Sequence, residues 1–439
     1  MRTTRSRVMT VTAGMASLAL FVAACGSNDG GDSSSAAGEG GGESSDEAVT
    51  LTVATFNEFG YEDLVTEYME LNPNITVELR KAATSNEARD NLNTRLAAGS
   101  GLADVEAIEV DWLPELTQYE GVFVDLSDPE LEGRWLDWKE AQATTEDGQL
   151  VGYGTDIGPE AVCYRSDLFE AAGLPTDRDE VAELLGSTWD DYFAVGEEFI
   201  ASSDVAWFDS AGAIYQGMIN QVDNAYEETD GTPIPLAENT VARGVYDDVM
   251  AASVGQGLSA NLAQWSEDWT NAFQTDGFAT MLCPAWMLGV IEGNAAGVEG
   301  WDIADTFPGG GGNWGGSFLT VPTQGENLEE SQKLAAWLTA PEQQIKAFVA
   351  KGTFPSQVEA LDDPELLELT REFFNDAPAG QIMATRAEAV EVVPFKGPNY
   401  FAIQQLVSDA INRVDVDGTD DADDSWAKAE NAFDELGLS

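Results

Sequence analysis

Several tryptophans lie in sequence contexts that could place an aromatic ring against a ligand. The chain has 12 tryptophans, and five of them lie beside glycine, proline or acidic residues in predicted loops. A flat indole offers an apolar face, and a carboxylate near it offers a charge-assisted hydrogen-bond acceptor. A sugar ring needs both, because it has a face of C–H bonds and a rim of hydroxyl groups. The five candidates are Trp112, Trp265, Trp269, Trp286 and Trp314.

Core packing is the competing interpretation for every tryptophan, and it is the better one for most. Trp337 lies in a predicted helix with a clear apolar face and is assigned to the core. Trp286 follows a predicted strand, and Trp314 lies in glycine-rich sequence. These two are therefore the strongest candidates for contact with a ligand.

Polar candidates follow the same predicted strands. Asn57 and Glu58 come after the first strand, Asp111 ends the third, and Asp156 precedes a segment rich in glycine and proline. Asn313 could donate to a ligand hydroxyl or close the turn before a glycine. In so acidic a chain each carboxylate could equally be a solvated surface charge, so position at a strand end is the reason to prefer these.

The sequence contains no histidine. This excludes Ser-His-Asp and Cys-His nucleophiles and histidine-ligated zinc. The acidic run at 415–424 lacks the spacing of a calcium-binding EF-hand loop, and the glycines at 309–312 are not followed by the Gly-Lys-Ser/Thr of a phosphate loop. We therefore expect neither a metal nor a cofactor.

The first residues have the pattern of a secretory signal. Arg2, Arg5 and Arg7 precede an apolar stretch over 8–22, which is too short to span a bilayer. Two alanines and Cys25 follow, which resembles the lipobox of bacterial lipoproteins. The resemblance implies a signal peptide at 1–24, a lipidated Cys25, and anchoring to the outer face of the cell membrane. An ordinary secretory signal with a chance cysteine is the alternative.

Residues 25–47 are almost all Gly, Ser, Ala, Asp and Glu, which predicts a flexible tether. If Cys25 carries lipid, Cys163 and Cys283 remain. In an oxidising compartment they form either a disulfide between two core strands or two buried thiols, and the compartment favours the disulfide.

Composition indicates a globular chain of two ordinary domains, with 43% apolar residues and a net charge of −59. Nucleic acid is excluded as a partner, because binding it needs a basic surface. The acidity keeps the protein soluble, or it suits a salty habitat in which ions screen the repulsion.

The elements that must position the candidates alternate along the chain. Strands are predicted at 49–56, 75–79 and 104–110, with helices at 61–71 and 86–98 between them. This order favours a mainly parallel sheet flanked by helices, with ligands bound at the carboxyl ends of its strands. Further strands are predicted at 150–156, 161–165, 278–283 and 316–322, and helices at 167–172, 189–200, 241–252, 266–273, 329–338 and 341–350.

Five segments together resemble the extracellular solute-binding proteins of ABC sugar importers, the group that includes maltose-binding protein. Within it, the set is most similar to actinobacterial binders of cellobiose and cello-oligosaccharides. The segments are ATFNEF (54–59), YRSDLFEAAGLP (164–175), CPAWMLG (283–289), GNWGGSF (312–318) and WLTAPEQQ (337–344).

The resemblance implies an α/β fold of the two-lobed periplasmic-binding-protein type II, each lobe a mixed, mainly parallel sheet flanked by helices. Crossing hinge segments would join lobe 1 (48–156 and about 314–355) to lobe 2 (157–313 and about 356–439). We expect a monomer without enzymatic activity that captures an oligosaccharide in the cleft and delivers it to the membrane subunits of an ABC permease.

Two other functions remain open from the residues. A secreted glycoside hydrolase also needs aromatic platforms, with two carboxylates flanking the scissile bond. A binding protein for a peptide or another non-sugar ligand would keep the fold, but would want fewer tryptophans and more cations.

Overall fold

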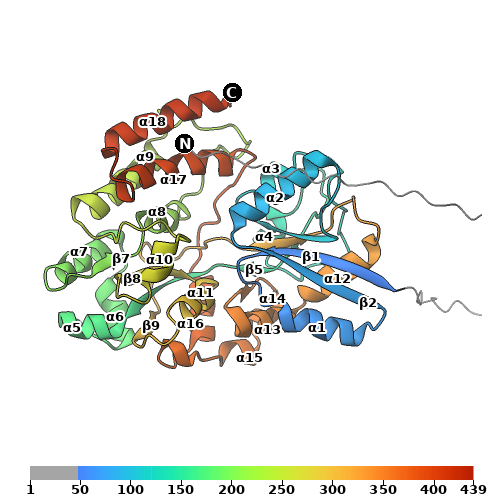
Figure 1. The fold of residues 1–439 in the computed structure, drawn as a ribbon, viewed down its shortest axis with the longest axis horizontal. Coiled ribbons are helices and arrows are strands. Elements are labelled where there is room, and N and C mark those ends of the chain that lie inside the picture. Colours follow the sequence, from blue (N-terminus) through green and yellow to red (C-terminus); the bar gives the residue numbers. More distant parts are fainter. Residues whose placement is uncertain (1–47, 120, 439) are drawn as a thin grey trace, which may run out of the picture. The chain divides into compact units, whose positions relative to one another are not determined.

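The computed structural model describes residues 48–119 and 121–438, which form an α/β unit with two main sheets (Figure 1). The predicted signal peptide, Cys25 and the tether fall within 1–47 and lie outside the described residues. None of the described helices combines the length and apolar composition that a membrane span requires.

The first sheet has five strands in the order β2-β1-β3-β10-β4. β1 pairs parallel with β2 and β3, whereas β10 runs antiparallel to β3 and β4. The predicted strand at 150–156 is divided into β4, which pairs with β10, and β5, which leaves this sheet to pair with β11. The bounds are β1 (Val49–Phe56), β2 (Ile75–Ala82), β3 (Val105–Glu109), β4 (Tyr153–Gly154), β5 (Asp156–Ile157), β10 (Ser317–Thr320) and β11 (Phe354–Pro355).

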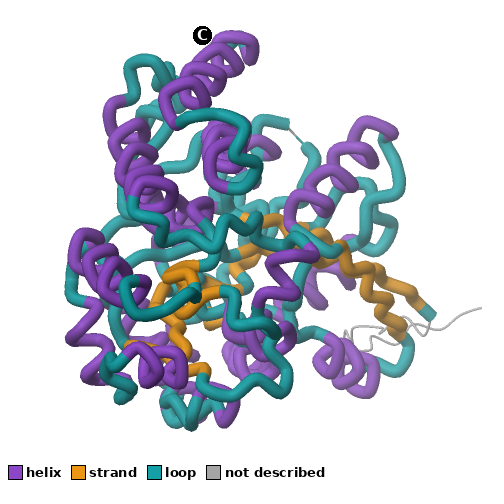
Figure 2. Tube along the Cα trace, turned by 60° about the vertical axis from the view of Figure 1, so that its left-hand side comes forward, coloured by secondary structure: helices purple, strands orange, loops and turns teal. Residues whose placement is uncertain are grey.

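The second sheet has four strands in the order β7-β8-β6-β9, and it corrects the expectation of mainly parallel pairing. Its β7 and β8 pair parallel, but β6 runs antiparallel to β8 and β9. Three strands thus share one direction, and β6 opposes them because it enters straight from the segment that leaves the first sheet. Helices surround the strands, as the purple and orange segments of Figure 2 show. The bounds are β6 (Glu160–Arg165), β7 (Ala206–Phe208), β8 (Phe278–Pro284) and β9 (Trp301–Ala304).

Local signals set the helix ends. α2 begins after Thr84, whose hydroxyl oxygen accepts a hydrogen bond from the amide of Glu87, and it ends at Gly99 with φ of 68°. The helices are α1 (Glu62–Leu71), α2 (Ser85–Ala98), α3 (Leu113–Leu116), α4 (Asp137–Gln142), α5 (Ser166–Ala172), α6 (Arg178–Leu185), α7 (Trp189–Ile200), α8 (Ala211–Ile219), α9 (Thr240–Met250), the π-helical η1 (Ala251–Gly255), α10 (Glu267–Ala272), α11 (Met287–Asn294), α12 (Leu328–Leu338), α13 (Pro341–Lys351), α14 (Val358–Leu361), α15 (Pro364–Leu367), the 3₁₀ η2 (Glu372–Phe374), α16 (Ala379–Glu388), α17 (Tyr400–Asp415) and α18 (Ala422–Leu436).

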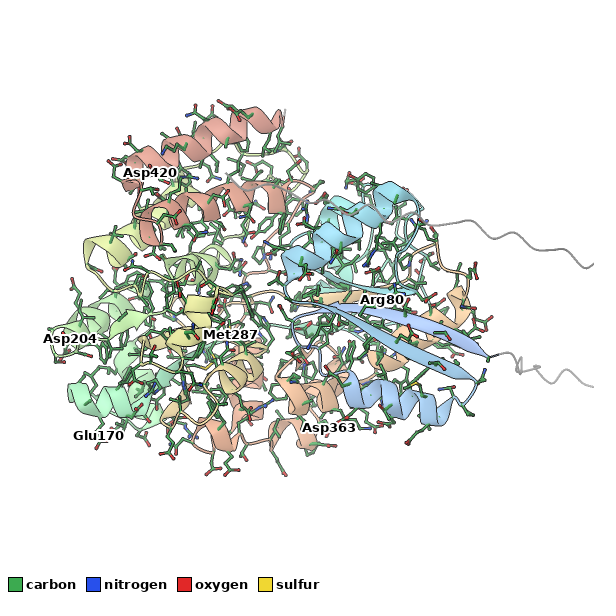
Figure 3. All side chains as sticks on the ribbon, in the orientation of Figure 1. Arg80, Glu170, Asp204, Met287, Asp363 and Asp420 are labelled. Carbon is green, nitrogen blue, oxygen red and sulfur yellow. A yellow bond between two sulfur atoms is a disulfide. The ribbon has the colours of Figure 1, made fainter. Side chains whose placement is uncertain are left out.

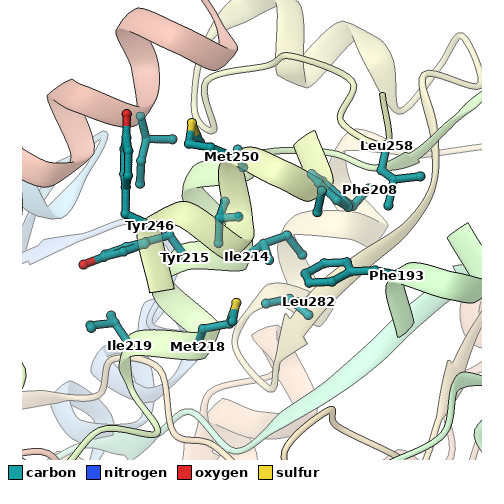
Figure 4. Packing of buried hydrophobic residues seen from close by; sticks show 14 of the residues in the cluster. Phe193, Phe208, Ile214, Tyr215, Met218, Ile219, Tyr246, Met250, Leu258 and Leu282 are labelled. Atoms are coloured by element: carbon teal, nitrogen blue, oxygen red, sulfur yellow. The ribbon is translucent and has the colours of Figure 1, made fainter. Parts of the chain in front are cut away.

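Each sheet has its own hydrophobic core. The core of the first sheet contains Leu51, Val53, Ile108 and Phe318, all fully buried. Against one face of the second sheet, α7, α8, α9, α17 and α18 pack into a second core. Figure 4 shows part of it, where Ile214 and Met218 of α8 lie near Leu282 of β8.

The other face of the second sheet is also covered. Val162 and Tyr164 of β6 point into the core just described, whereas Ala161 and Cys163 alternate to the opposite face. There they pack with α11, α13 and α16. On this face Cys163 of β6 and Cys283 of β8 are joined by a disulfide across 120 residues of sequence.

Three stretches of chain pass between the two sheets. β5 pairs with β11, and an isolated bridge joins Pro159 to Asn313. These stretches lie at the predicted lobe boundaries, but α13 supplies Ala347 to the first core and Phe348 to the core shared with α11 and α16. The residue bounds of the lobes therefore stay a prediction.

Acidic side chains cover the outside. Figure 3 labels Glu170 and Asp204 among those that project outward, and both are exposed. This distribution agrees with a charge that acts on solubility rather than on the fold.

Candidate ligand-binding cavity

A cavity of about 430 Å³ is lined both by residues that follow strands of the first sheet and by residues of α8 and α17, which pack on the second sheet. This volume is in the range of small-molecule sites. One wall comes from the ends of β1 and β3 and the start of α2, and the other from α8, α17 and the loop before α10. Its lining includes seven of the predicted residues: Asn57, Glu58, Asp111, Asp156, Trp265, Trp286 and Trp314.

Three indoles form the aromatic part of the lining. The rings of Trp265 and Trp286 are nearly parallel, with centroids 6.1 Å apart and 21° between planes. Trp314 stands almost perpendicular to Trp286, at 5.6 Å and 85°. Trp265 is 39% exposed and the other two are half-buried, so all three present ring surface outside the packed cores.

The main chain beneath these rings is closely packed. The Nε1–H of Trp286 donates to the carbonyl oxygen of Trp314 at 2.8 Å, and the amide of Trp314 donates to the carbonyl of Gly158 at 2.8 Å. A Cβ at Gly158 would lie 1.9 Å from the Trp314 carbonyl oxygen and 3.0 Å from Trp286 Nε1. Only glycine fits there, and the crossing segment thereby fixes two rings of the site.

Asn313 stabilises this arrangement rather than facing a ligand. Its Oδ1 accepts from the amide of Gly158 at 2.8 Å, and its Nδ2 donates to the carbonyl of Gly315 at 3.0 Å. Asn313 is buried and absent from the cavity lining. The turn-closing alternative is therefore the one that the structure supports.

Trp112 and Trp269 also lie behind the wall, contrary to the expectation of ligand contact. Both are wholly buried. Trp112 donates through Nε1 to the hydroxyl of Ser85 at 2.9 Å, and Trp269 donates to Asp209 at 2.8 Å. Each ring supports a residue that does line the cavity, since Ser85 is part of the wall and Trp269 packs 5.3 Å from Trp265.

The lining carboxylates differ in their partners. Asp111 is ion-paired with Lys396, whose side chain is 6% exposed. Asp156 accepts from the hydroxyl of Thr155 at 2.6 Å and from the amide of Ser317 at 3.0 Å. Burial raises the pKa of Asp156, although nearby Lys139 opposes this.

Glu109 joins these carboxylates at the cavity wall. Burial and the charge of Asp111 raise the pKa of Glu109 to about 8. Burial lowers the pKa of the ammonium of Lys139, which lies behind the wall, to about 7. At neutral pH the proton on Glu109 lets this carboxyl group donate a hydrogen bond as well as accept one.

Glu58 is the most exposed of the predicted carboxylates that line the cavity, at 34% of its side chain. Burial raises its pKa, but hydrogen bonds from Lys81 and Lys351 outweigh burial, so its pKa is lowered overall. Asn57, beside it, has a positive φ of 46°, as expected where a strand turns sharply into the site.

Sequence reasoning missed the polar wall on the helices. Gln404, Ser408 and Asn412 of α17 line the cavity at a spacing of four residues, and Gln216 of α8 accepts a hydrogen bond from Gln404. Their only sequence signal is a stripe of uncharged polar residues on one helical face, and this pattern does not distinguish a cavity wall from a solvated surface. The other missed polar residues are Thr84, Ser85, Asn86, Glu109, Ser210, Gln264, Gln405, Ser317 and Thr353.

Within 48–119 and 121–438 the structure has no cluster of three or more histidine, cysteine or acidic side chains suited to hold a metal ion. The cavity offers stacking surfaces, carboxylates, amides and hydroxyls. This set can bind a ligand with apolar faces and many hydroxyl groups.

Sequence comparison identifies the family. The profile of the bacterial extracellular solute-binding proteins matches residues 63–373, which is most of the chain. The chain belongs to this family. No curated protein matches it by sequence.

Solved structures of other solute-binding proteins have the same fold. A crystal structure of an extracellular solute-binding protein of family 1 is 50% identical over 88% of this chain and 99% of its own, with a TM-score of 0.78. The ABC transporter associated binding protein of B. animalis subsp. lactis, in complex with β-1,6-galactobiose, is 20% identical over 89% of this chain and 98% of its own, with a TM-score of 0.75. Maltose-bound MalE3 of T. maritima is 16% identical over 89% of this chain and 100% of its own, with a TM-score of 0.70. These matches support the two-lobed solute-binding fold that the sequence predicted.

Proposed function

We propose that this protein is the substrate-binding component of an ABC importer and that its ligand is an oligosaccharide. The observation that carries the proposal is the group of three indoles, Trp265, Trp286 and Trp314, at a cavity that also presents carboxylates. Aromatic faces cover the C–H faces of sugar rings, and carboxylates accept from the hydroxyl groups.

The proposed ligand is cellobiose or a cello-oligosaccharide. The resemblance of segments such as CPAWMLG and GNWGGSF to cello-oligosaccharide binders supports this choice. The solute-binding proteins with solved structures include complexes with β-1,6-galactobiose, maltose and lacto-N-biose, which supports a sugar in general.

Binding would proceed by closure of the two lobes about the crossing segments. Closure expels water and brings the polar wall of α17 against the sugar held on the indoles. The affinity then comes from the stability of the closed form with ligand relative to the open form. We further propose that the protein is a monomer, anchored through Cys25 outside the cytoplasm, and that the closed form docks on a permease.

No chemical step is part of this proposal. A thermal-shift panel of cellobiose, cellotriose, maltose and short peptides tests it, because a ligand that binds the folded state raises the melting temperature as its concentration exceeds Kd. The expected result is a rise with the β-linked glucose oligomers. A rise with peptides alone would contradict the proposal.

A glycoside hydrolase would also bind these sugars, and product analysis separates the two functions. Incubation of cellotetraose with the protein should leave its length unchanged. Steady release of shorter sugars would overturn the assignment as a binding protein.

A further inference from the structure

Two buried carboxylates outside the cavity lining hold one loop of its wall. The loop is 259–266, between the bridge at Ser259 and the start of α10. It supplies Ala263, Gln264 and Trp265 to the cavity. Asp209 is wholly buried and Asp415 is 4% exposed, and neither lines the cavity.

The backbone of this loop is in an unfavourable conformation at two places. Asn261 has φ of 58° and Trp265 has φ of 71°. The left-handed region is rare for a residue as bulky as tryptophan, and it persists only where surrounding contacts enforce it. Trp265 is also one of the exposed large apolar side chains, so its position depends on a few contacts, among them the contact of its ring with Trp269.

Asp415 fixes the first half of the loop. Its carboxylate accepts hydrogen bonds from Asn261 Nδ2 at 2.9 Å, from the hydroxyl of Ser259 at 3.2 Å, and from the hydroxyl of Ser253. It also accepts from the amide of Ala211 at 3.4 Å, at the start of α8. Because Asp415 ends α17, it connects the loop to two helices that line the same cavity.

Asp209 fixes the second half. Its Oδ2 accepts from Gln264 Nε2 at 2.8 Å and from Trp269 Nε1 at 2.8 Å. Trp269 in turn packs against Trp265, with ring centroids 5.3 Å apart. One oxygen of Asp209 therefore positions Gln264 directly. It positions Trp265 indirectly, through the buried ring of Trp269.

We propose that Asp209 and Asp415 are positioning residues that hold loop 259–266 in the shape that presents Gln264 and Trp265 to a bound sugar. This inference rests on the proposed function and deepens it. The carboxylates touch no ligand, and their contribution passes through the loop.

A double-mutant cycle with cellotriose as the probe tests this by calorimetric titration. Asp209→Ala and Trp265→Ala should each weaken binding by about ten-fold. The double variant should lose less than the roughly hundred-fold product of the two single effects, because Asp209 acts partly through Trp265 and partly through Gln264. Asp209→Asn, which keeps an acceptor oxygen for both donors, should restore most of the affinity. A double variant weakened by the product of both effects would overturn the proposal.

Hydrogen exchange without ligand gives an independent readout. Asp209→Ala and Asp415→Asn should speed amide exchange in 259–266. Asp302→Ala is the matched control, since Asp302 is 1% exposed and accepts from Arg178 and Asn375, away from this loop. Unchanged exchange in the loop would refute the positioning role. If cellotriose binds neither the wild type nor any variant, the proposed function is wrong. The hydrogen-exchange result still decides whether the two carboxylates position the loop.

Discussion

The indole Nε1–H of Trp286 donates a 2.8 Å hydrogen bond to the main-chain carbonyl oxygen of Trp314. One aromatic residue of the cavity thereby holds the backbone of another, and their rings stand at 85°. Two ring faces are fixed in different directions before any ligand arrives. Such preorganisation lowers the entropy that binding must overcome.

This relationship predicts different effects for two substitutions of Trp286. Trp286→Ala should weaken oligosaccharide binding by about 2 kcal/mol, roughly thirty-fold, since it removes a central aromatic surface. Trp286→Phe keeps a ring but loses the hydrogen bond to Trp314, so its affinity for the oligosaccharide should lie between those of the wild type and Trp286→Ala. Calorimetric titration measures all three. Equal affinities would show that the sugar does not use this surface.

Gly158 predicts a steric effect on the same site. Gly158→Ala should abolish measurable binding or unfold the protein, because its Cβ would meet the carbonyl oxygen of Trp314 at 1.9 Å. Gly244→Ala in α9 is the matched control, since nothing lies within 4 Å of its Cβ position. A mid-helix glycine replaced by alanine should raise stability by about 0.5–1 kcal/mol. A Gly158→Ala variant with normal folding and affinity would contradict the described packing.

The buried ion pair of Lys396 and Asp111 predicts a large loss of stability. Their side chains are 6% and 10% exposed, so Lys396→Met leaves the carboxylate of Asp111 buried without its cation. We expect the free energy of unfolding in urea to fall by about 3 kcal/mol. Lys333→Met removes an exposed pair with Glu329 and should cause no measurable change. Similar effects of the two substitutions would argue against a buried pair.

Glu109 predicts a pH dependence of stability. Its pKa is raised to about 8 in the folded state, from an ordinary value of 4.5. Between these pH values the folded state binds more protons than the unfolded state, so the free energy of unfolding should decrease as pH rises. Lys139 acts in the opposite sense above about pH 7, where its lowered pKa favours the folded state as pH increases.

Urea unfolding at pH 5, 6 and 7 isolates the contribution of Glu109, because Lys139 stays protonated over most of this window. Glu109→Gln should become more stable relative to wild type as pH rises from 5 to 7. If the difference in free energy of unfolding between the two proteins stayed constant from pH 5 to 7, Glu109 would ionise normally in the folded state.

Local sequence was sufficient for β1, α1, β2, α2 and β3, the first five elements of the described chain. Alternating residues predicted β1, and Asn72 and Gly99 marked the ends of α1 and α2, where the structure has their caps. These features depend on neighbours in sequence. The direction of β6 in the second sheet depends on where the chain crosses from the first, which residue patterns do not encode.

In the candidate site too, sequence predicted what depends on neighbouring residues and missed what depends on residues distant in sequence. Trp286 and Trp314 were found because their rings had no helical face to occupy. Trp112, which follows a predicted strand, and Trp269, which lies in a predicted helix, are both covered by residues distant in sequence, such as Ser85 and Asp209. Gln404 and Asn412 were missed because a polar helical stripe has the same pattern whether it faces water or a cavity.

The most direct test of the account is a calorimetric titration of wild-type protein and Trp286→Ala with cellobiose and cellotriose. We predict saturable binding to the wild type at one site per chain, strongly weakened binding to Trp286→Ala, and recovery of the sugar intact. Absence of binding to the wild type, or equal binding to both proteins, would contradict the claim that these indoles and carboxylates hold a sugar.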